Sequence, residues 1–236
     1  MHSYIINSIT ELDSVKDGWD QIYFDSATEN PFLCWEWNNA WSNTFFSEGS
    51  VKIIVIFDGD EILCIAPFAI KNKKITFLAD NFFADYSDII TGELTNAVIE
   101  MVVKELVQLK DWDKMSLLTI PEFSPSLKYL ESVLKKTGLH TEVTCVYLNP
   151  FIDTTTEFDE YLASRSNGVR KELRRSKNKL DKTFSNWEFF EAETIDDKIN
   201  VLNALIDLHL RRQGGKVGTS IFQDSAHVEF YNNLVK

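Results

Sequence analysis

The stretch VKIIVIFDGDEILCIAPFAI, residues 51 to 70, decides the fold. Residues 51–57 form a continuous, mostly β-branched run, and a second apolar run covers residues 61–70. Asp58-Gly59-Asp60 lies between them, and two strand-like runs joined by such a short turn predict a β-hairpin. Pro67 has no backbone N–H to give to a neighbouring strand, so we expect it at a bulge or an edge position.

The segments around this hairpin predict an α+β domain over residues 1 to 150. After a polar turn, residues 75–78 add a third strand, and the short connections make the three strands an antiparallel meander. We expect further strands at 4–6, 88–91, 114–120 and 142–148, and helices at 11–23, 32–46, 95–109 and 124–136. The fold class is therefore α+β, a mostly antiparallel sheet with helices on its faces.

Residues 151 to 236 have a different pattern, after a linker at NPFIDTTT, residues 149–156. Helices are expected at 157–163, 167–182, 195–212 and 223–236, with one strand at 187–192. One strand does not make a sheet. Either this strand joins the first sheet, or residues 151 to 236 open a second lobe that is truncated at Lys236.

A strongly basic segment lies in this second part, SRSNGVRKELRRSKNKLDK at residues 164–182. Its eight cations and two carboxylates give a net charge of +6 in a chain of −12, so the remainder carries −18. Ser166 or Asn167 is the expected N-cap. Helical spacing predicts one buried stripe (Val169, Leu173, Ser176, Leu180) and one basic face that includes Arg170 and Arg174. That face either binds an anionic phosphate or carboxylate or is solvated and balances acidic neighbours.

Composition limits the class of protein. The isoelectric point of about 4.8 argues against nucleic-acid binding over the whole surface. No run approaches the roughly 20 apolar residues of a membrane helix, and the N-terminus lacks a basic region before an apolar run. The three cysteines lie in apolar contexts and indicate buried thiols in a reducing compartment, and the four histidines show no metal-ligand spacing. We expect a cytoplasmic protein without a metal.

Two stretches of the first domain carry candidate binding residues. The helix expected at 32–46 is unusually aromatic; core packing explains most of its rings, and Trp37 is the candidate for lining a cleft. In the loop DNFFADYSD, residues 80–88, the carboxylates of Asp85 and Asp88 flank Tyr86. These residues either bind a cationic or hydroxylated group or serve as loop caps and turns.

Five stretches, taken in order, resemble one family. They are NPFLCWEWNNAW (30–41), FDGDEILCIAPFAI (57–70), DYSDII (85–90), SRSNGVRKELRRSKNKL (164–180) and LIDLHLRRQGGKVGTSIF (205–222). Together they resemble the CelD-like branch of the GNAT acetyltransferase superfamily, which is associated with cellulose and exopolysaccharide biosynthesis. That branch is similar in layout to the Fem-type peptidoglycan aminoacyltransferases, which have two GNAT-like lobes.

This resemblance implies a first GNAT-like lobe over residues 1 to 150 and the opening of a second, whose acyl-donor site would follow residue 236. Gly214, Gly215 and Gly218 follow an expected helix and not a strand, so we do not interpret them as a phosphate-binding loop. The implied activity is transfer of an acyl group from acetyl-CoA or another acyl-CoA to an amine or hydroxyl of a cell-envelope saccharide or its precursor.

Acyl transfer needs a base for the nucleophile, a polarised carbonyl and a protonated leaving thiolate. The candidate bases are Glu36, Asp85, Asp88 and His209, of which Asp85 and His209 are taken as catalytic. Arg211 and Arg212 beside His209 would favour its neutral imidazole, although a helix histidine near a lobe interface is the simpler explanation of this residue. Candidate ligands for anionic groups are Arg170, Arg174, Arg175 and Arg211.

Two alternatives stay open. One is a non-catalytic binding or scaffold module of the same fold in an envelope biosynthesis complex. The other is a transferase that takes an aminoacyl-tRNA as donor, supported by the basic segment and opposed by the −18 elsewhere. A saccharide or small-molecule acceptor is the expected partner, and the oligomeric state is open.

Overall fold

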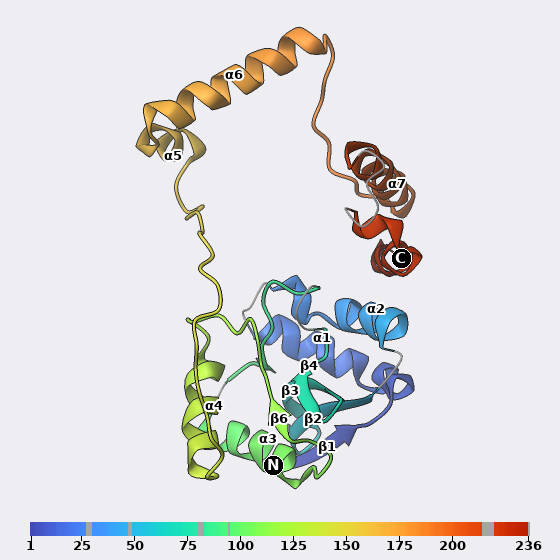
Figure 1. The fold of residues 1–236 in the computed structure, drawn as a ribbon, viewed down its shortest axis with the longest axis vertical. Helices are drawn as coiled ribbons and strands as arrows, with labels where there is room; N and C mark the ends of the chain where they lie inside the picture. The colour runs from blue at the N-terminus through green and yellow to red at the C-terminus, as the bar shows by residue number, and fades with distance from the viewer. Residues whose placement is uncertain (27–29, 47–48, 80–82, 94, 214–219, 236) are drawn as a thin grey trace. The chain divides into compact units, whose positions relative to one another are not determined.

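The computed structural model describes all residues except 27–29, 47–48, 80–82, 94, 214–219 and 236 (Figure 1). The chain divides into two units, residues 1–146 together with 199–236, and residues 147–198. Each unit is described by itself. The sequence predicts one lobe over residues 151 to 236; in the structure, the segment 199–236 has its contacts with residues 1–146, because its last helix packs there.

The first unit is built on a mixed, open, six-stranded sheet, which agrees with the predicted α+β class. Its strands are β1 (His2–Ile6), β2 (Ser50–Asp58), β3 (Glu61–Lys71), β4 (Lys74–Phe77), β5 (Ile90–Thr91) and β6 (Lys114–Met115). The order is β1-β2-β3-β4-β6, with β5 also paired to β3. The β2–β3 hairpin is central, as predicted, and every pair is antiparallel except β4–β6.

Pro67 lies inside β3, where strand pairing changes from one neighbour to another. On this side β5 pairs with residues 64–65 and β4 pairs with residues 68–71. The carbonyl of Pro67 accepts a hydrogen bond from Leu78 N (2.8 Å) on this side. The position where other residues carry an N–H therefore faces the same side, between the segments that pair with β5 and with β4. The expectation of a bulge or an edge position is wrong, because β3 is an interior strand and the register shift lies at Ile56/Phe57.

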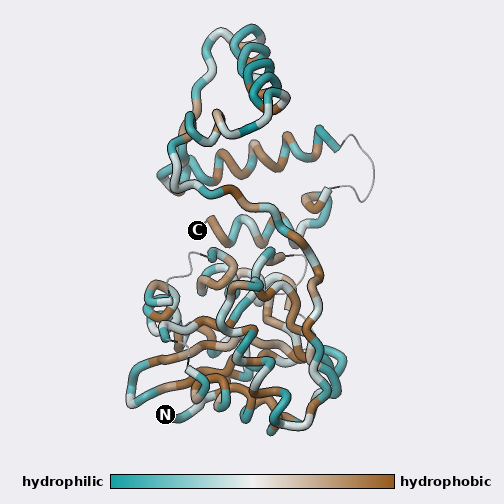
Figure 2. The backbone as a smooth tube through the Cα atoms, turned by 90° about the vertical axis from the view of Figure 1, so that its left-hand side faces the viewer, coloured by the Kyte–Doolittle hydropathy of each residue, from teal (hydrophilic) through white to brown (hydrophobic). Residues whose placement is uncertain are grey.

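Helices cover both faces of the sheet. The 3₁₀-helix η1 (Ile9–Val15) and α1 (Lys16–Asp25) pack on one face, and α3 (Asn96–Gln108) and α4 (Pro125–Lys136) pack on the other. The period-two alternation of a strand separates the two cores. Along β2, Ile53 and Val55 point to the first core, whereas Ile54 and Ile56 point to the second. Brown, hydrophobic segments accordingly run through the lower part of the tube in Figure 2, near the N-terminus.

A local structure occurs twice in this unit. The 3₁₀-helix η2 (Pro31–Leu33) precedes α2 (Trp35–Phe45), and η3 (Ile221–Gln223) precedes α8 (Ser225–Val235); both α-helices have 11 residues. A constant shift of 190 residues places Phe32 on Phe222, and it also places the rings of Trp37 and Trp41 on those of His227 and Tyr231. Another helix precedes each copy, α1 or α7 (Ile195–Arg212), and α2 packs against α8.

The second unit contains α5 (Phe158–Ser164) and the basic helix α6 (Asn167–Thr183). Ser166 is the N-cap of α6, as predicted, and its side chain accepts a hydrogen bond from Val169 N. The expected buried stripe is wrong, because Val169 and Leu173 are both exposed. The segments 142–148 and 187–192 are not strands, since no strand in the described part of the chain pairs with them, and Phe189 is 90% exposed.

Candidate functional site

The best-defined candidate site is the region where α2 meets α8. Rings from both helices contact one another: the Trp37 indole lies edge-on to Phe32 (4.9 Å between centroids) and to Phe230 (5.1 Å). Phe230 is fully buried and also contacts Phe45 and Phe83. We call these five residues the α2–α8 aromatic cluster. It places the predicted Trp37 between the two copies of the repeated structure.

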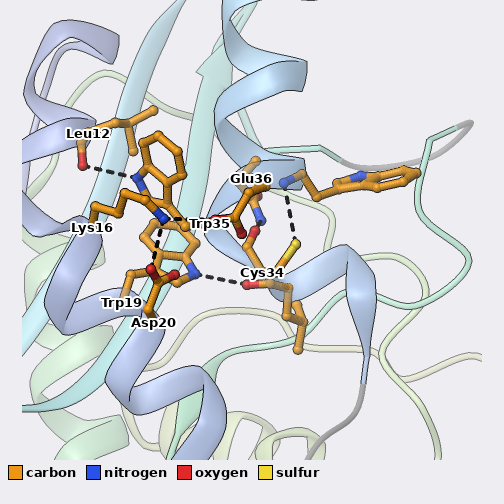
Figure 3. A network of polar contacts seen from close by, with 10 residues as sticks. Leu12, Lys16, Trp19, Asp20, Cys34, Trp35 and Glu36 are labelled. Carbon is orange, nitrogen blue, oxygen red and sulfur yellow. Dashed lines mark hydrogen bonds and ion pairs between the residues drawn. The ribbon is translucent and has the colours of Figure 1, made fainter. Parts of the chain in front are cut away.

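A polar network joins α1 to the start of α2, the helix that carries Trp37 (Figure 3). The ammonium of Lys16 lies 2.8 Å from both Asp20 and Glu36 and sits over the Trp35 ring. Lys16 donates hydrogen bonds to both carboxylates, and these bonds raise its pKa to about 12. The bond to Asp20 has the largest effect. The indole of Trp35 also donates to Leu12 O (3.2 Å), so the start of α2 is fixed to η1 and α1.

Several buried polar atoms beside the aromatic cluster have no hydrogen-bond partner among the described residues. They are the indole nitrogens of Trp37 and Trp41, the hydroxyls of Ser42 and Thr44, and Nδ1 of His227. His227 Nδ1 lies 3.4 Å from an Asp224 carboxylate oxygen, at ion-pair distance. Most buried donors in proteins are paired. The region therefore combines apolar rings with buried hydrogen-bonding groups that have no described partner, and this makes it a candidate site.

His209 is connected to this cluster through a series of ring contacts. Its imidazole lies edge-on to Phe222 (5.4 Å), Phe222 contacts Tyr231, and Tyr231 contacts Phe230. The half-buried His209 also makes a hydrogen bond through Nδ1 with the hydroxyl of Ser220 (2.8 Å). The structure thus brings the predicted Trp37 and His209 into one connected region, although 172 positions separate them in the sequence.

The loop that carries Asp85, Tyr86 and Asp88 gives its residues different environments. Asp85 is exposed, and Tyr86 is partly exposed, with its carbonyl accepting a hydrogen bond from the Asn30 side chain (3.2 Å). Asp88 is only 8% exposed. Both of its carboxylate oxygens are used, one by Ile89 N (2.7 Å) and the other by the Ser124 hydroxyl.

Ser124 explains why Asp88 is buried at this place. It is the N-cap of α4, as predicted, and its hydroxyl accepts from Ser126 N (3.1 Å) while donating to Asp88. The carboxylate therefore lies at the positive end of a helix dipole. Burial nevertheless raises the pKa of Asp88, and the hydrogen bonds from Ser124 and Ser126 oppose that shift. Of the two interpretations of Asp88, the loop cap is the one that the geometry favours.

A small cavity adjoins Asp88. Its volume is about 10 Å³, close to the room needed for one water molecule. Its lining comes from three of the stretches that carry the family resemblance, including Phe32 and Asn38 from the first, Pro67 from the second, and Ser87 and Asp88 from the third. This cavity is too small for a substrate, so it marks a packed junction of these stretches.

The predicted arginines fall into two groups. Arg211 belongs to the first unit and pairs with Asp207 (2.8 Å) on the same helix. Arg170, Arg174 and Arg175 belong to α6 in the second unit. Arg170 is bound to the helix start through Ala163 O (3.0 Å) and Asn167, and Arg175 lies 3.9 Å from Glu172. Arg174 is exposed and makes no ion pair with a described residue, so its guanidinium is available to an anion.

Sequence reasoning missed Ser220 and Phe230. Ser220 is a buried cap whose Oγ accepts from Phe222 N (3.2 Å), and Phe230 is the centre of the aromatic cluster. The repeat at a shift of 190 residues places Ser220 in register with Asn30 and is the signal for Ser220; it places Phe230 on Ala40 and gives no signal for that ring. The glycines at 214, 215 and 218 lie outside the described residues.

No group of three or more metal-ligating side chains occurs among the residues that the structure describes. Within that same part of the chain, no helix has the length and apolar character needed to cross a membrane. Comparison with protein-family models, with curated proteins and with solved structures finds no match to this chain.

Proposed function

We propose that this chain belongs to a GNAT-type acyltransferase that works in the cytoplasm. It would transfer the acyl group of acetyl-CoA or another acyl-CoA to an amine or hydroxyl of a cell-envelope saccharide or its precursor. The proposal starts from the resemblance of the five ordered stretches to the CelD-like branch. The α+β class with a mixed sheet is compatible with it, and the repeated α2 and α8 structures support a layout with two related lobes.

One observation carries the proposal: four of the five stretches meet within the first unit. The first and third are joined by the Asn30–Tyr86 hydrogen bond, and Pro67 of the second lines the same cavity as Asp88. The fifth, which contains His209 and Ser220, reaches Trp37 of the first through ring contacts.

The roles follow from exposure and partners. Asp85 is an exposed carboxylate that can accept a proton from an amine or hydroxyl. The rings of Trp37 and Tyr86 would contact the acceptor. Arg174 is the best placed of the α6 arginines to hold a phosphate or carboxylate, since no ion pair with a described residue occupies it.

Calorimetric titration of acetyl-CoA into the full chain tests the proposal. Saturable binding is expected, with weaker binding for Arg174→Ala and unchanged binding for Lys128→Ala, an exposed lysine of α4. Coenzyme A serves as a control for recognition of the phosphates alone. Absence of binding by acetyl-CoA and by longer acyl-CoAs at millimolar concentration would reject an acyl-CoA donor.

A non-catalytic binding module is the second candidate function. It is favoured by the use of both Asp88 oxygens in fixed hydrogen bonds, which removes one of the candidate bases. Binding of an acyl-CoA or a saccharide without any turnover would support this function. An aminoacyl-tRNA donor would instead show binding that weakens steeply with salt, because counterions are released when phosphates are neutralised.

A further inference from the structure

The hydrogen bond between His209 and Ser220 indicates which nitrogen of the neutral imidazole, Nδ1 or Nε2, carries the proton. His209 is in the last turn of α7, and Ser220 lies just before η3. The distance from Nδ1 to Oγ is 2.8 Å. The same Oγ accepts a hydrogen bond from the backbone N–H of Phe222 at 3.2 Å. Which atom donates in the His209–Ser220 bond depends on the tautomer of the imidazole.

Counting protons around Ser220 decides between the two tautomers. A serine hydroxyl has one hydrogen and two lone pairs, and the Phe222 N–H occupies one lone pair. Ser220 is only 6% exposed, so its hydrogen needs an acceptor within the protein. Among the described residues, the acceptor within hydrogen-bond distance is His209 Nδ1. If Nδ1 carried a proton instead, the buried hydroxyl hydrogen would lose its acceptor.

The repeated local structure shows that capping η3 does not require a histidine. In the first copy Asn30 takes the place of Ser220, and its side-chain oxygen accepts from Phe32 N at 3.1 Å. Its amide nitrogen then donates to Tyr86 O, and no histidine is involved. The cap of the second copy could form equally well with a serine alone. The contact with His209 is therefore an addition to the common architecture.

We infer that Ser220 is a positioning residue that holds neutral His209 as an Nε2–H hydrogen-bond donor and not as a base. Nε2 makes no hydrogen bond with a described residue. Its partner would be an oxygen that carries or develops negative charge. If the proposed acyl transfer holds, that oxygen is the carbonyl oxygen of an acyl thioester during attack. The base is then left to Asp85.

Ring-nitrogen NMR on the full chain tests the tautomer without needing any activity. Long-range ¹H–¹⁵N spectra are recorded at a pH where the ring is neutral, and His209→Gln assigns the signals. The expected result is almost exclusively the Nε2–H form in the wild type and in Ser220→Thr, and a mixture of the two tautomers in Ser220→Ala. Asn30→Ala removes the matching cap from the other copy and should leave the His209 signals unchanged.

Two results of that experiment would overturn the inference. A dominant Nδ1–H form in the wild type would make Nε2 an acceptor, which is the state of a base. Unchanged His209 signals in Ser220→Ala, with circular dichroism showing that the variant is folded, would mean that Ser220 does not set the tautomer.

Acetyl transfer kinetics test the ligand. A glutamine amide nitrogen can replace Nε2 as a donor, whereas the asparagine side chain is too short. His209→Gln should keep kcat within about tenfold of wild type, and His209→Asn should lose on the order of 10²-fold, the usual effect of removing one oxyanion donor. Equal losses in both variants would overturn the donor role. A wild type that binds no acetyl-CoA would overturn the proposed function and the ligand together, while the NMR result on Ser220 would stand.

Discussion

Asn30 and Ser220 occupy equivalent positions in two copies of one local structure. Each side chain accepts a hydrogen bond from the backbone N–H two residues further on, at 3.1 and 3.2 Å. Each is followed by a three-residue 3₁₀-helix and then by an 11-residue α-helix. The two copies meet because α2 and α8 pack together. The contact between the copies is therefore the natural place to test what stabilises this unit.

Phe230→Ala should destabilise the first unit strongly. The ring is fully buried and contacts Trp37, Phe45 and Phe83, and truncating a buried phenylalanine costs about 3–5 kcal/mol. Urea unfolding monitored by tryptophan fluorescence measures the change. Phe24→Ala is the matched control, because that ring is 77% exposed, and it should change the free energy of unfolding by less than about 0.5 kcal/mol. Similar values for the two variants would show that α8 does not stabilise the unit.

Asp88→Asn should change how stability depends on pH. Because the folded protein raises the pKa of this carboxyl, it binds more protons than the unfolded chain, and the Asp88 contribution to stability falls as pH rises from the unfolded value of about 3.8 through the folded pKa. Asparagine does not ionise, so this fall is absent. The free energy of unfolding of the variant, relative to wild type, should therefore increase from pH 3 to pH 7.

The comparison that checks this uses Asp85→Asn, which removes an exposed carboxyl three residues away; an equal trend in both variants would contradict burial of Asp88 as the cause. Ser124→Ala tests the same account of Asp88 from the other side of the hydrogen bond. It removes both the cap of α4 and a hydrogen bond to the buried carboxylate, and it should cost about 1–3 kcal/mol at neutral pH. A cost close to zero would contradict the account of Asp88 as a loop cap.

Features that depend on neighbouring residues could be predicted from the sequence. The β2–β3 hairpin follows from two apolar runs and the short turn between them, and the caps Ser124 and Ser166 follow from residues next to each helix. The strand predictions for 142–148 and 187–192 were wrong for a physical reason. A strand is stable only when it pairs with another strand, and the apolar content of a segment does not reveal whether such a partner is present. The same applies to the Val169–Leu173 stripe, whose helical spacing is correct but which nothing covers in the described structure.

The candidate site, like the fold, could be predicted only where the signal lies in neighbouring residues. Trp37, His209 and the Asp85–Asp88 loop were named from residue type and local context. That Trp37 and His209 belong to one region depends on the packing of α2 against α8, which joins segments far apart in the sequence. Ser220 was missed because a single serine is common in loops and its partner lies 11 residues away. Only the repeat at a shift of 190 residues distinguishes it.

Lys16→Met should destabilise the junction of α1 and α2 by about 0.5–1 kcal/mol at pH 7, a value that allows for solvent screening of a partly exposed ion pair. The folded protein raises the pKa of Lys16 from 10.5 to about 12, so its stabilising effect is complete below pH 10.5 and disappears as pH rises through 12. Unfolding at low and high salt measures it, since salt weakens the ion pair. Lys128→Met, without an ion pair to a described residue, should show no salt dependence.

The arginines of α6 offer a matched pair that separates a structural role from a binding role. Arg170 donates to Ala163 O and contacts Asn167, so Arg170→Ala should loosen the start of α6. Loss of an exposed hydrogen bond that contributes about 0.5–1 kcal/mol should make the amides of the first turn exchange roughly two- to fivefold faster, which hydrogen exchange measures. Arg174→Ala removes no such bond and should leave exchange unchanged while weakening acyl-CoA binding in calorimetry. If Arg174→Ala changes neither quantity, this arginine is only a solvated charge, and the basic face of α6 loses its best candidate for holding an anion.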